Sequence, residues 1–149
     1  MDLNHVLIID SFLTPKECNK IIKMYASLKF RVLADHSGYE DWGVNITSEK
    51  LKFLFKKLEK ATLKYRKKFP EVNYLSKITL RECRIKLFRP GKHFANWHAD
   101  HDPETLTRIL GLMIYLSDHQ CGTEFFNGEV VRSKQGRLIM WPSSFTHTH

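Results

Sequence analysis

The hydrophobic pattern changes its period near Pro70, and this change limits the chain to a few architectures. Before that proline, apolar residues recur every three or four positions in two segments, which is typical of amphipathic helices. After it, short apolar or alternating segments are separated by turn residues, which is typical of β-strands. Helices followed by a series of short strands predict an α+β fold, with helices packed on one side of a β-sandwich or barrel.

Two helices are predicted in the first half of the chain. Thr14-Pro15-Lys16-Glu17 has the form of a capping box with proline at the first helical position, so the first helix should run from about residue 15 to 28. A second helix should follow Thr47 or Ser48 and end before Pro70. Its apolar stripe comprises Leu51, Leu54, Phe55, Leu58, Ala61, Tyr65 and Phe69. Residues 30–47 predict irregular or short-strand structure.

Seven strands are predicted, over residues 5–12, 78–88, 94–100, 108–117, 123–126, 129–131 and 137–141. The segment Arg108 to Ser117 is almost continuously apolar, as expected of a strand buried on both faces. Asn127-Gly128 between two short strands is a strong hairpin signal. Arg89-Pro90-Gly91-Lys92 predicts a turn.

Length and composition favour one cytoplasmic globular domain over residues 1–149. No apolar run reaches the roughly 18 residues of a membrane span, so no membrane partner is expected. The early acid Asp2 and the lack of a basic-then-apolar layout argue against a secretory signal. Cys18, Cys83 and Cys121 are too widely separated for a zinc-ribbon or redox pair, and we expect reduced thiols.

The chain carries 24 basic and 16 acidic residues, for a net charge of +8. Such an excess could attract nucleic acid. Seven of the basic residues lie in one helical run: Lys56, Lys57, Lys60, Lys64, Arg66, Lys67 and Lys68. No aromatic residues alternate with these charges as a base-stacking surface requires. A solvated helix face is therefore the favoured interpretation, and a nucleic-acid partner is the less favoured alternative.

His98-Ala99-Asp100 places an imidazole and a carboxylate two residues apart, so in a strand both side chains point to the same face. Two histidines and one carboxylate on one face of an ion leave positions open, as in non-haem Fe(II) oxygenases. The third ligand could come from His147 or His149. His-x-Asp on its own is a weak signal, because this spacing often arises by chance.

Four blocks in the second half resemble the prolyl 4-hydroxylase-like branch of the 2-oxoglutarate/Fe(II) oxygenase superfamily, in its compact bacterial and phage form. They are FRPGKHFANWHAD, RILGLMIYLSD, CGTEFFNG and GRLIMWPSSFTHTH, and VLIIDSFLTPKECNKII near the N-terminus is similar to the segment that opens this branch. The resemblance implies a double-stranded β-helix (jelly-roll) core over residues 78–149, supported by helices within residues 1–77. It also implies Fe(II), 2-oxoglutarate as cosubstrate, ascorbate as a candidate reductant, and hydroxylation of a peptidyl proline or another amino-acid residue.

The resemblance also assigns roles to single residues. His98 and Asp100 match the proximal metal ligands, and the distance from Trp141-Pro142 indicates His147 as the distal ligand, with His149 as the alternative. Tyr115 matches a tyrosine that binds the distal carboxylate of 2-oxoglutarate. Phe88 stands where many relatives have a tyrosine that contacts the cosubstrate, and its ring could line the pocket.

One departure from the family pattern concerns the cosubstrate. Relatives usually carry an Arg or Lys about ten residues after the distal histidine, where it pairs with the carboxylate of 2-oxoglutarate, and the printed sequence stops at His149. The expectation is a C-terminally truncated domain that lacks its last core strand. Two alternatives remain: a non-catalytic or truncated jelly-roll binding domain that retains a metal site, and a cupin-like protein that holds Zn(II) or Mn(II).

Overall fold

The computed structural model describes residues 4–27, 34–35, 39–43, 49–75, 78–80, 83–94, 96–101, 103 and 105–149. The chain forms two compact units. The first combines Met1–Leu28 with Trp97–His149, and the second is Lys29–Asn96.

The first unit contains an antiparallel sheet with the strand order β1-β8-β5. Its strands are β1 (Leu7–Ile9), β5 (Leu110–Ile114) and β8 (Leu138–Pro142). The central strand β8 pairs with β1 through Ile8 and Ile139 and with β5 through Gly111 and Trp141. All four residues from Leu138 to Trp141 are buried, whereas β5 is mostly half-buried. The prediction for residues 108–117 was therefore right about the strand but wrong about its burial on both faces.

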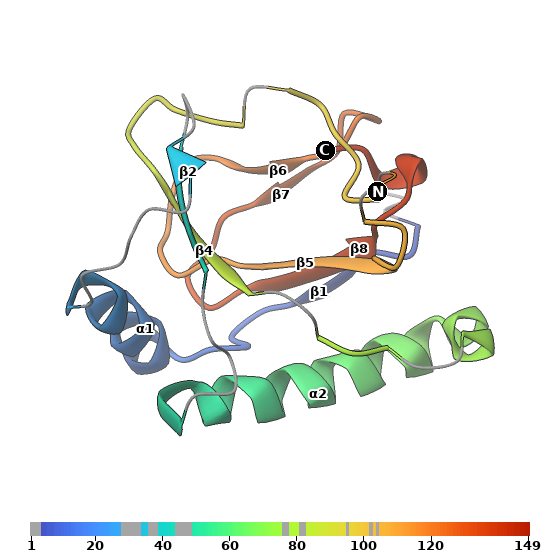
Figure 1. The fold of residues 1–149 in the computed structure, drawn as a ribbon, viewed down its shortest axis with the longest axis horizontal. Coiled ribbons are helices and arrows are strands. Elements are labelled where there is room, and N and C mark those ends of the chain that lie inside the picture. Colours follow the sequence, from blue (N-terminus) through green and yellow to red (C-terminus); the bar gives the residue numbers. More distant parts are fainter. Residues whose placement is uncertain are drawn as a thin grey trace. The chain divides into compact units, whose positions relative to one another are not determined.

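A hairpin of β6 (Gly122–Glu124) and β7 (Val130–Arg132) forms the second layer of this unit (Figure 1). The Asn127-Gly128 turn is confirmed, because the Phe125 N–H donates to Glu129 O at 2.8 Å and Gly128 has a φ of 84°. Such a φ favours glycine. The core between hairpin and sheet contains Val6, Phe125, Val131, Ile139 and Trp141, with Met113 and Tyr115 packed against it.

Helix α1 (Pro15–Ser27) begins at the predicted capping box. The Thr14 N–H donates to Glu17 Oε2 at 2.8 Å, and the Glu17 N–H donates to Thr14 Oγ1 at 3.2 Å. These reciprocal bonds satisfy two of the amide groups that a helix start leaves unpaired. Cys18 and Ile21 form the buried stripe of α1, and the predicted last residue, Leu28, lies outside the described residues.

The second unit contains the antiparallel sheet β2-β3-β4 and the longer helix. Its elements are β2 (Ala34–Asp35), β3 (Tyr39–Gly43), η1 (Glu49–Leu51), α2 (Lys52–Lys68), η2 (Pro70–Tyr74) and β4 (Arg84–Phe88). The buried residues of α2 are Leu54, Leu58, Ala61 and Tyr65, which confirms the helical stripe. The predicted turn after β4 is also confirmed, because the Lys92 N–H donates to Arg89 O at 2.9 Å.

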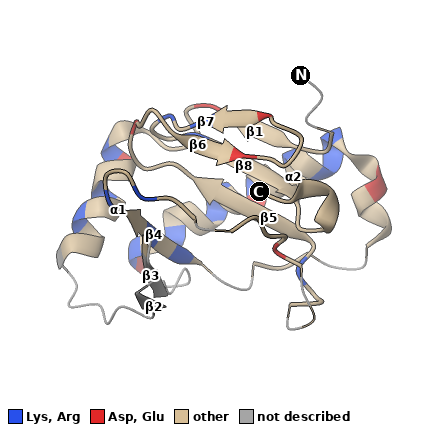
Figure 2. Cartoon of the chain, turned by 90° about the horizontal axis from the view of Figure 1, so that it is seen from above, with Lys and Arg blue, Asp and Glu red and all other residues tan. Residues whose placement is uncertain are grey.

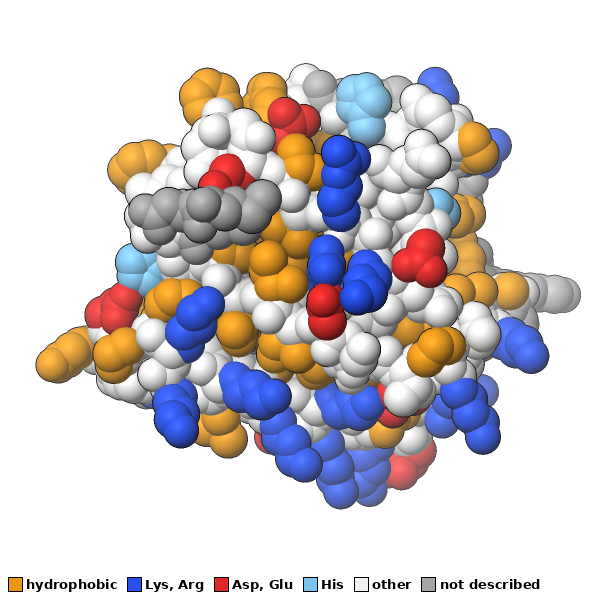
Figure 3. All heavy atoms as spheres, turned by 180° about the vertical axis from the view of Figure 1, so that it is seen from behind, with side chains coloured by type: hydrophobic (Ala, Val, Ile, Leu, Met, Phe, Trp, Pro, Cys, Tyr) orange, Lys and Arg blue, Asp and Glu red, His pale blue; other side chains and the backbone are white. Residues whose placement is uncertain are grey.

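The basic residues of α2 lie mainly on its exposed side, where Lys56, Lys60, Lys64, Lys67 and Lys68 are all exposed. Figure 2 shows the basic segments along this helix, and in Figure 3 lysine and arginine side chains gather on the lower part of the face that is shown. This exposure fits a solvated helix face. Within the part of the chain that the structure describes, no helix has the length and hydropathy to span a bilayer.

An ion pair joins the end of β1 to the start of β8 and should make stability depend on pH. Arg137 Nε donates to Asp10 Oδ1 at 2.6 Å, and Nη2 donates to Oδ2 at 3.2 Å. The hydrogen bond from Arg137 lowers the pKa of Asp10 below its ordinary value. A lowered carboxyl pKa adds stability above the ordinary pKa of about 4 and loses it as pH falls through the lowered value.

We therefore expect Asp10→Asn to reduce the free energy of unfolding at about pH 6, and the difference from wild type to shrink toward about pH 2. Denaturant unfolding across this range measures it. Lys134→Ala is the control, because Lys134 Nζ lies 3.5 Å from Asp10 Oδ2 with 55% of its side chain exposed, and such pairs contribute little. If the free energy of unfolding changed equally with pH in wild type and in Asp10→Asn, the prediction would be contradicted.

Candidate metal centre

Two backbone hydrogen bonds bring the proximal histidine and the C-terminal segment together. The His98 N–H donates to His149 O at 3.1 Å, and the His149 N–H donates to His98 O at 3.0 Å. This reciprocal pattern is that of a hydrogen-bonded antiparallel pair, in which both side chains lie on the same face. No strand is assigned to the described residues among 94–100, so the predicted strand there was wrong, although His98 pairs locally with His149.

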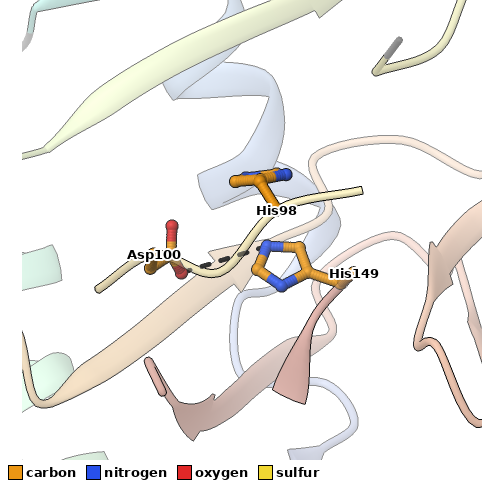
Figure 4. Close-up of side chains that lie close together, drawn as sticks. All are labelled: His98, Asp100 and His149. Atoms are coloured by element: carbon orange, nitrogen blue, oxygen red, sulfur yellow. Dashed lines mark ion pairs between the residues drawn. The ribbon is translucent and has the colours of Figure 1, made fainter. Parts of the chain in front are cut away.

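The side chains of His98, Asp100 and His149 face one another (Figure 4). Their candidate ligand atoms all lie within 4.8 Å of one another. His149 Nε2 lies 3.9 Å from Asp100 Oδ2, and the two imidazole centroids are 4.5 Å apart. Ligand atoms about 2.0–2.2 Å from one ion would stand about 3 Å apart on one face. Small side-chain rotations would therefore bring all three residues onto one ion.

His147, the distal ligand predicted from the sequence, is not part of this cluster. It ends the short helix η3 (Phe145–His147), its Nε2 lies 2.6 Å from Asn4 O, and its Nδ1 lies 2.9 Å from Thr146 Oγ1. The structure instead brings His149 to His98 and Asp100. The physical reason is the backbone pairing, which puts His149 directly opposite His98, whereas the η3 turn directs His147 to the N-terminal segment.

The carbonyl of Asp100 accepts two further hydrogen bonds. Thr105 Oγ1 donates to it at 2.8 Å, and Arg108 Nη1 donates at 3.3 Å. The Arg108 carbonyl in turn accepts a bond of 2.6 Å from Ser143 Oγ. These contacts fix the backbone beside Asp100 and hold the residue in place. Neither Thr105 nor Arg108 was singled out from the sequence, and no local pattern marks them.

Gly111 lies against the Asp100 side of the cluster. A Cβ added there would overlap Asp100 Oδ2 and would stand 2.8 Å from Trp141 Nε1. The site therefore needs glycine at this position of β5. The sequence does contain a signal for it, because a lone glycine inside a strand pattern often marks a close approach of other groups.

Aromatic rings border His149 on two sides. The Trp141 ring lies 4.9 Å from the His149 imidazole, nearly perpendicular to it, and Phe125 lies 6.1 Å away. Both rings are 2% exposed. They keep water from the buried side of the cluster, which strengthens electrostatic interactions there.

Tyr115 carries its hydroxyl into the core between the hairpin and the sheet. The hydroxyl lies 2.7 Å from Thr123 Oγ1 and donates to Val131 O at 3.2 Å. Burial raises the pKa of Tyr115, so the hydroxyl stays protonated and can donate. Tyr115 and Gly111 share a face if the alternation of β5 continues. Thr123, which no sequence pattern indicated, adds a buried hydroxyl beside that of the half-buried Tyr115.

Phe88, the other residue predicted at the cosubstrate site, lies in the second unit at the end of β4. Its ring centroid is 5.1 Å from that of Tyr39, and 38% of the residue is exposed. Its role toward a cosubstrate remains a prediction.

Comparison by sequence gives no matching family model and no matching curated protein. Comparison by structure gives the class of fold, which is that of the prolyl hydroxylases. One similar structure is the viral collagen prolyl hydroxylase vCPH from Paramecium bursaria Chlorella virus-1 in complex with 2-oxoglutarate, with 18% identity and a TM-score of 0.66 over 95% of this chain and 79% of that one.

Two further solved structures are similar to this chain. A truncated form of the same viral enzyme has 19% identity and a TM-score of 0.68, over 97% of this chain and 75% of that one. A prolyl-4-hydroxylase from Pseudomonas putida has 14% identity and a TM-score of 0.69, over 98% and 83%. These likenesses confirm the resemblance at the level of the fold, and with it the α+β class with antiparallel sheets.

Proposed function

We propose that the protein is an Fe(II)- and 2-oxoglutarate-dependent dioxygenase that hydroxylates a C–H bond of a peptidyl proline or another amino-acid residue. The observation that carries the proposal is the convergence of His98, Asp100 and His149 in a chain with the fold of prolyl hydroxylases. We further propose that residues 1–149 act as one oxygenase domain, with helical support in 1–77 and a jelly-roll core in 78–149, in the cytoplasm.

The donor set fits Fe(II). Two neutral imidazoles and one carboxylate can occupy one face of the ion and leave the other positions open, which suits a non-haem Fe(II) oxygenase site. When bound, the iron would supply the oxidising chemistry, with dioxygen and 2-oxoglutarate as co-reactants and succinate and carbon dioxide as by-products. His98, Asp100 and His149 would hold the ion, and the buried rings of Trp141 and Phe125 would keep water from one side of it.

Tyr115 and Thr123 would bind the distal carboxylate of 2-oxoglutarate. Their hydroxyls already lie 2.7 Å apart inside an otherwise apolar core. A carboxylate accepts hydrogen bonds from neutral hydroxyls without a change of protonation, and such charge-assisted bonds are stronger than neutral ones.

Anaerobic reconstitution with Fe(II) and 2-oxoglutarate tests the proposal. The expected result is a weak visible absorption band, followed by succinate formation when air and proline-containing peptides are added, with and without ascorbate. Both signals should be lost in His98→Ala and Asp100→Ala and kept in His119→Ala, an exposed histidine outside the cluster. Metal binding without the band or succinate would instead favour a non-catalytic jelly-roll binding domain.

Tyr115→Phe should weaken 2-oxoglutarate binding without changing metal binding. The substitution removes one hydroxyl that would donate a hydrogen bond to the carboxylate. Such a bond to a charged group contributes about 1.5–3 kcal/mol, which corresponds to roughly 10–100-fold in affinity. Titration of the visible band with 2-oxoglutarate gives the dissociation constant. Tyr74→Phe, at a residue that is 94% exposed, is the matched control. Wild-type affinity in Tyr115→Phe would remove Tyr115 from the cosubstrate site.

A further inference from the structure

Trp141 contains a buried polar group that has no partner. The residue is 2% exposed, and among the described residues its Nε1 makes no hydrogen bond. A buried donor without an acceptor is costly, and most buried polar groups in native proteins are paired. An orphaned N–H in a well-packed core therefore indicates an acceptor that takes its place in another state of the protein.

The position of the indole identifies this acceptor. Trp141 in β8 lies directly opposite Gly111 in β5, so both residues share one face of the sheet. Asp100 Oδ2 and Trp141 Nε1 both border the small space that a side chain on Gly111 would fill. The Trp141 ring is also packed against His149 at 4.9 Å. The orphaned N–H is therefore next to the carboxylate of the metal cluster.

We propose that Trp141 is a positioning residue for Asp100: its indole N–H donates to the Asp100 carboxylate when that carboxylate holds a metal ion, and Gly111 provides the space for the contact. The proposal rests on the metal site of the proposed function. A carboxylate that binds an ion through one oxygen keeps acceptor capacity for a donor beside it. Hydrogen-bond donors beside a metal-binding carboxylate orient that carboxylate and tune its affinity for the ion.

The variant Trp141→Phe tests the role of the indole N–H separately from that of the aromatic ring, and metal binding is the quantity measured. Phenylalanine keeps an aromatic ring in the core but has no N–H group. We expect the dissociation constant for Mn(II), measured by anaerobic calorimetry, to rise about 10–100-fold, as for the loss of other outer partners of metal ligands. Trp97→Phe is the matched control, because Trp97 is 52% exposed and its ring packs on Phe126. It should bind Mn(II) as wild type does.

A second measurement holds even if Trp141→Phe does not fold. In protein with ¹⁵N-labelled tryptophan, the indole resonance of Trp141 is assigned by elimination with Trp42→Phe and Trp97→Phe. Zn(II), which is diamagnetic, should shift its proton downfield in the wild-type chain. In Asp100→Ala, which lacks a metal ligand, the same addition should leave the resonance in place and so shows that the shift requires the bound ion.

The outcomes separate this inference from the proposed function. If wild type binds Mn(II) but Trp141→Phe binds it equally well, or if Zn(II) leaves the Trp141 resonance unmoved, Trp141 does not position Asp100 and the metal site stands. If wild type binds neither ion, the metal site and the inference are both overturned.

Discussion

Replacing His149 with alanine is expected to abolish iron binding, whereas replacing His147 with alanine is expected to preserve it. In His149→Ala the cluster loses one of its three side chains. The affinity for Fe(II) should fall by more than about 100-fold, because the loss of a direct ligand should exceed the 10–100-fold cost of losing an outer partner. Succinate formation should fall to background. Anaerobic calorimetry and a succinate assay measure the two effects.

His147→Ala is a matched control because it removes the same side chain two residues earlier. His147 Nε2 lies 2.6 Å from Asn4 O, so the variant should lose one hydrogen bond to the N-terminal segment. The expected cost is about 1 kcal/mol of unfolding free energy, with unchanged affinity for Fe(II). The opposite result, in which His147→Ala loses iron and His149→Ala keeps it, would restore the ligand predicted from the sequence.

The largest expected effect on stability concerns Gly136, at the turn before β8. Gly136 has a φ of 80°, and an added Cβ would overlap the backbone oxygen of Leu13. The Leu13 N–H also donates to Gly136 O at 3.1 Å, so the two segments cannot separate without losing this bond. Gly136→Ala should cost several kcal/mol: about 1–2 for the left-handed backbone, and the rest for the displaced backbone and the lost bond.

Gly128→Ala separates these two contributions. Gly128 has a φ of 84° in the hairpin turn, and an added Cβ there would meet no atom within 4 Å. This variant should therefore lose only the backbone term, about 1–2 kcal/mol. Denaturant unfolding of both variants gives the comparison. If the two variants lost similar free energies of unfolding, the backbone at Gly136 and Leu13 would be shown to shift at little cost.

Local sequence signals predicted the elements that are determined by neighbouring residues. The capping box at Thr14, the stripe of α2 and the Asn127-Gly128 turn all depend on groups within a few positions of one another. These elements could therefore be predicted from residue spacing alone. The burial of β5 could not be predicted from residue spacing, because it depends on which strand lies beside β5 in the sheet. Strand β8 occupies the centre of the sheet and is buried from Leu138 to Trp141.

The same distinction explains the candidate site. His98 and Asp100 are two residues apart, so their common direction followed from local geometry. The partner histidine is about fifty positions away, and its identity depends on a backbone pairing and on the η3 turn that precedes it. Spacing from Trp141-Pro142 pointed to His147, and no local rule distinguishes it from His149. Trp141, Thr123 and Gly111 join the site only through the packing of β5, β6 and β8.

The reciprocal main-chain bonds between His98 and His149 have a consequence for engineering. Because peptide groups pair the two backbones, the position of both imidazoles on one face does not depend on the side chains next to them in the sequence. Trp97 and Ala99 can then be randomised in a library without dismantling the cluster. Variants selected for new substrates at these two positions should inherit the same ligand geometry.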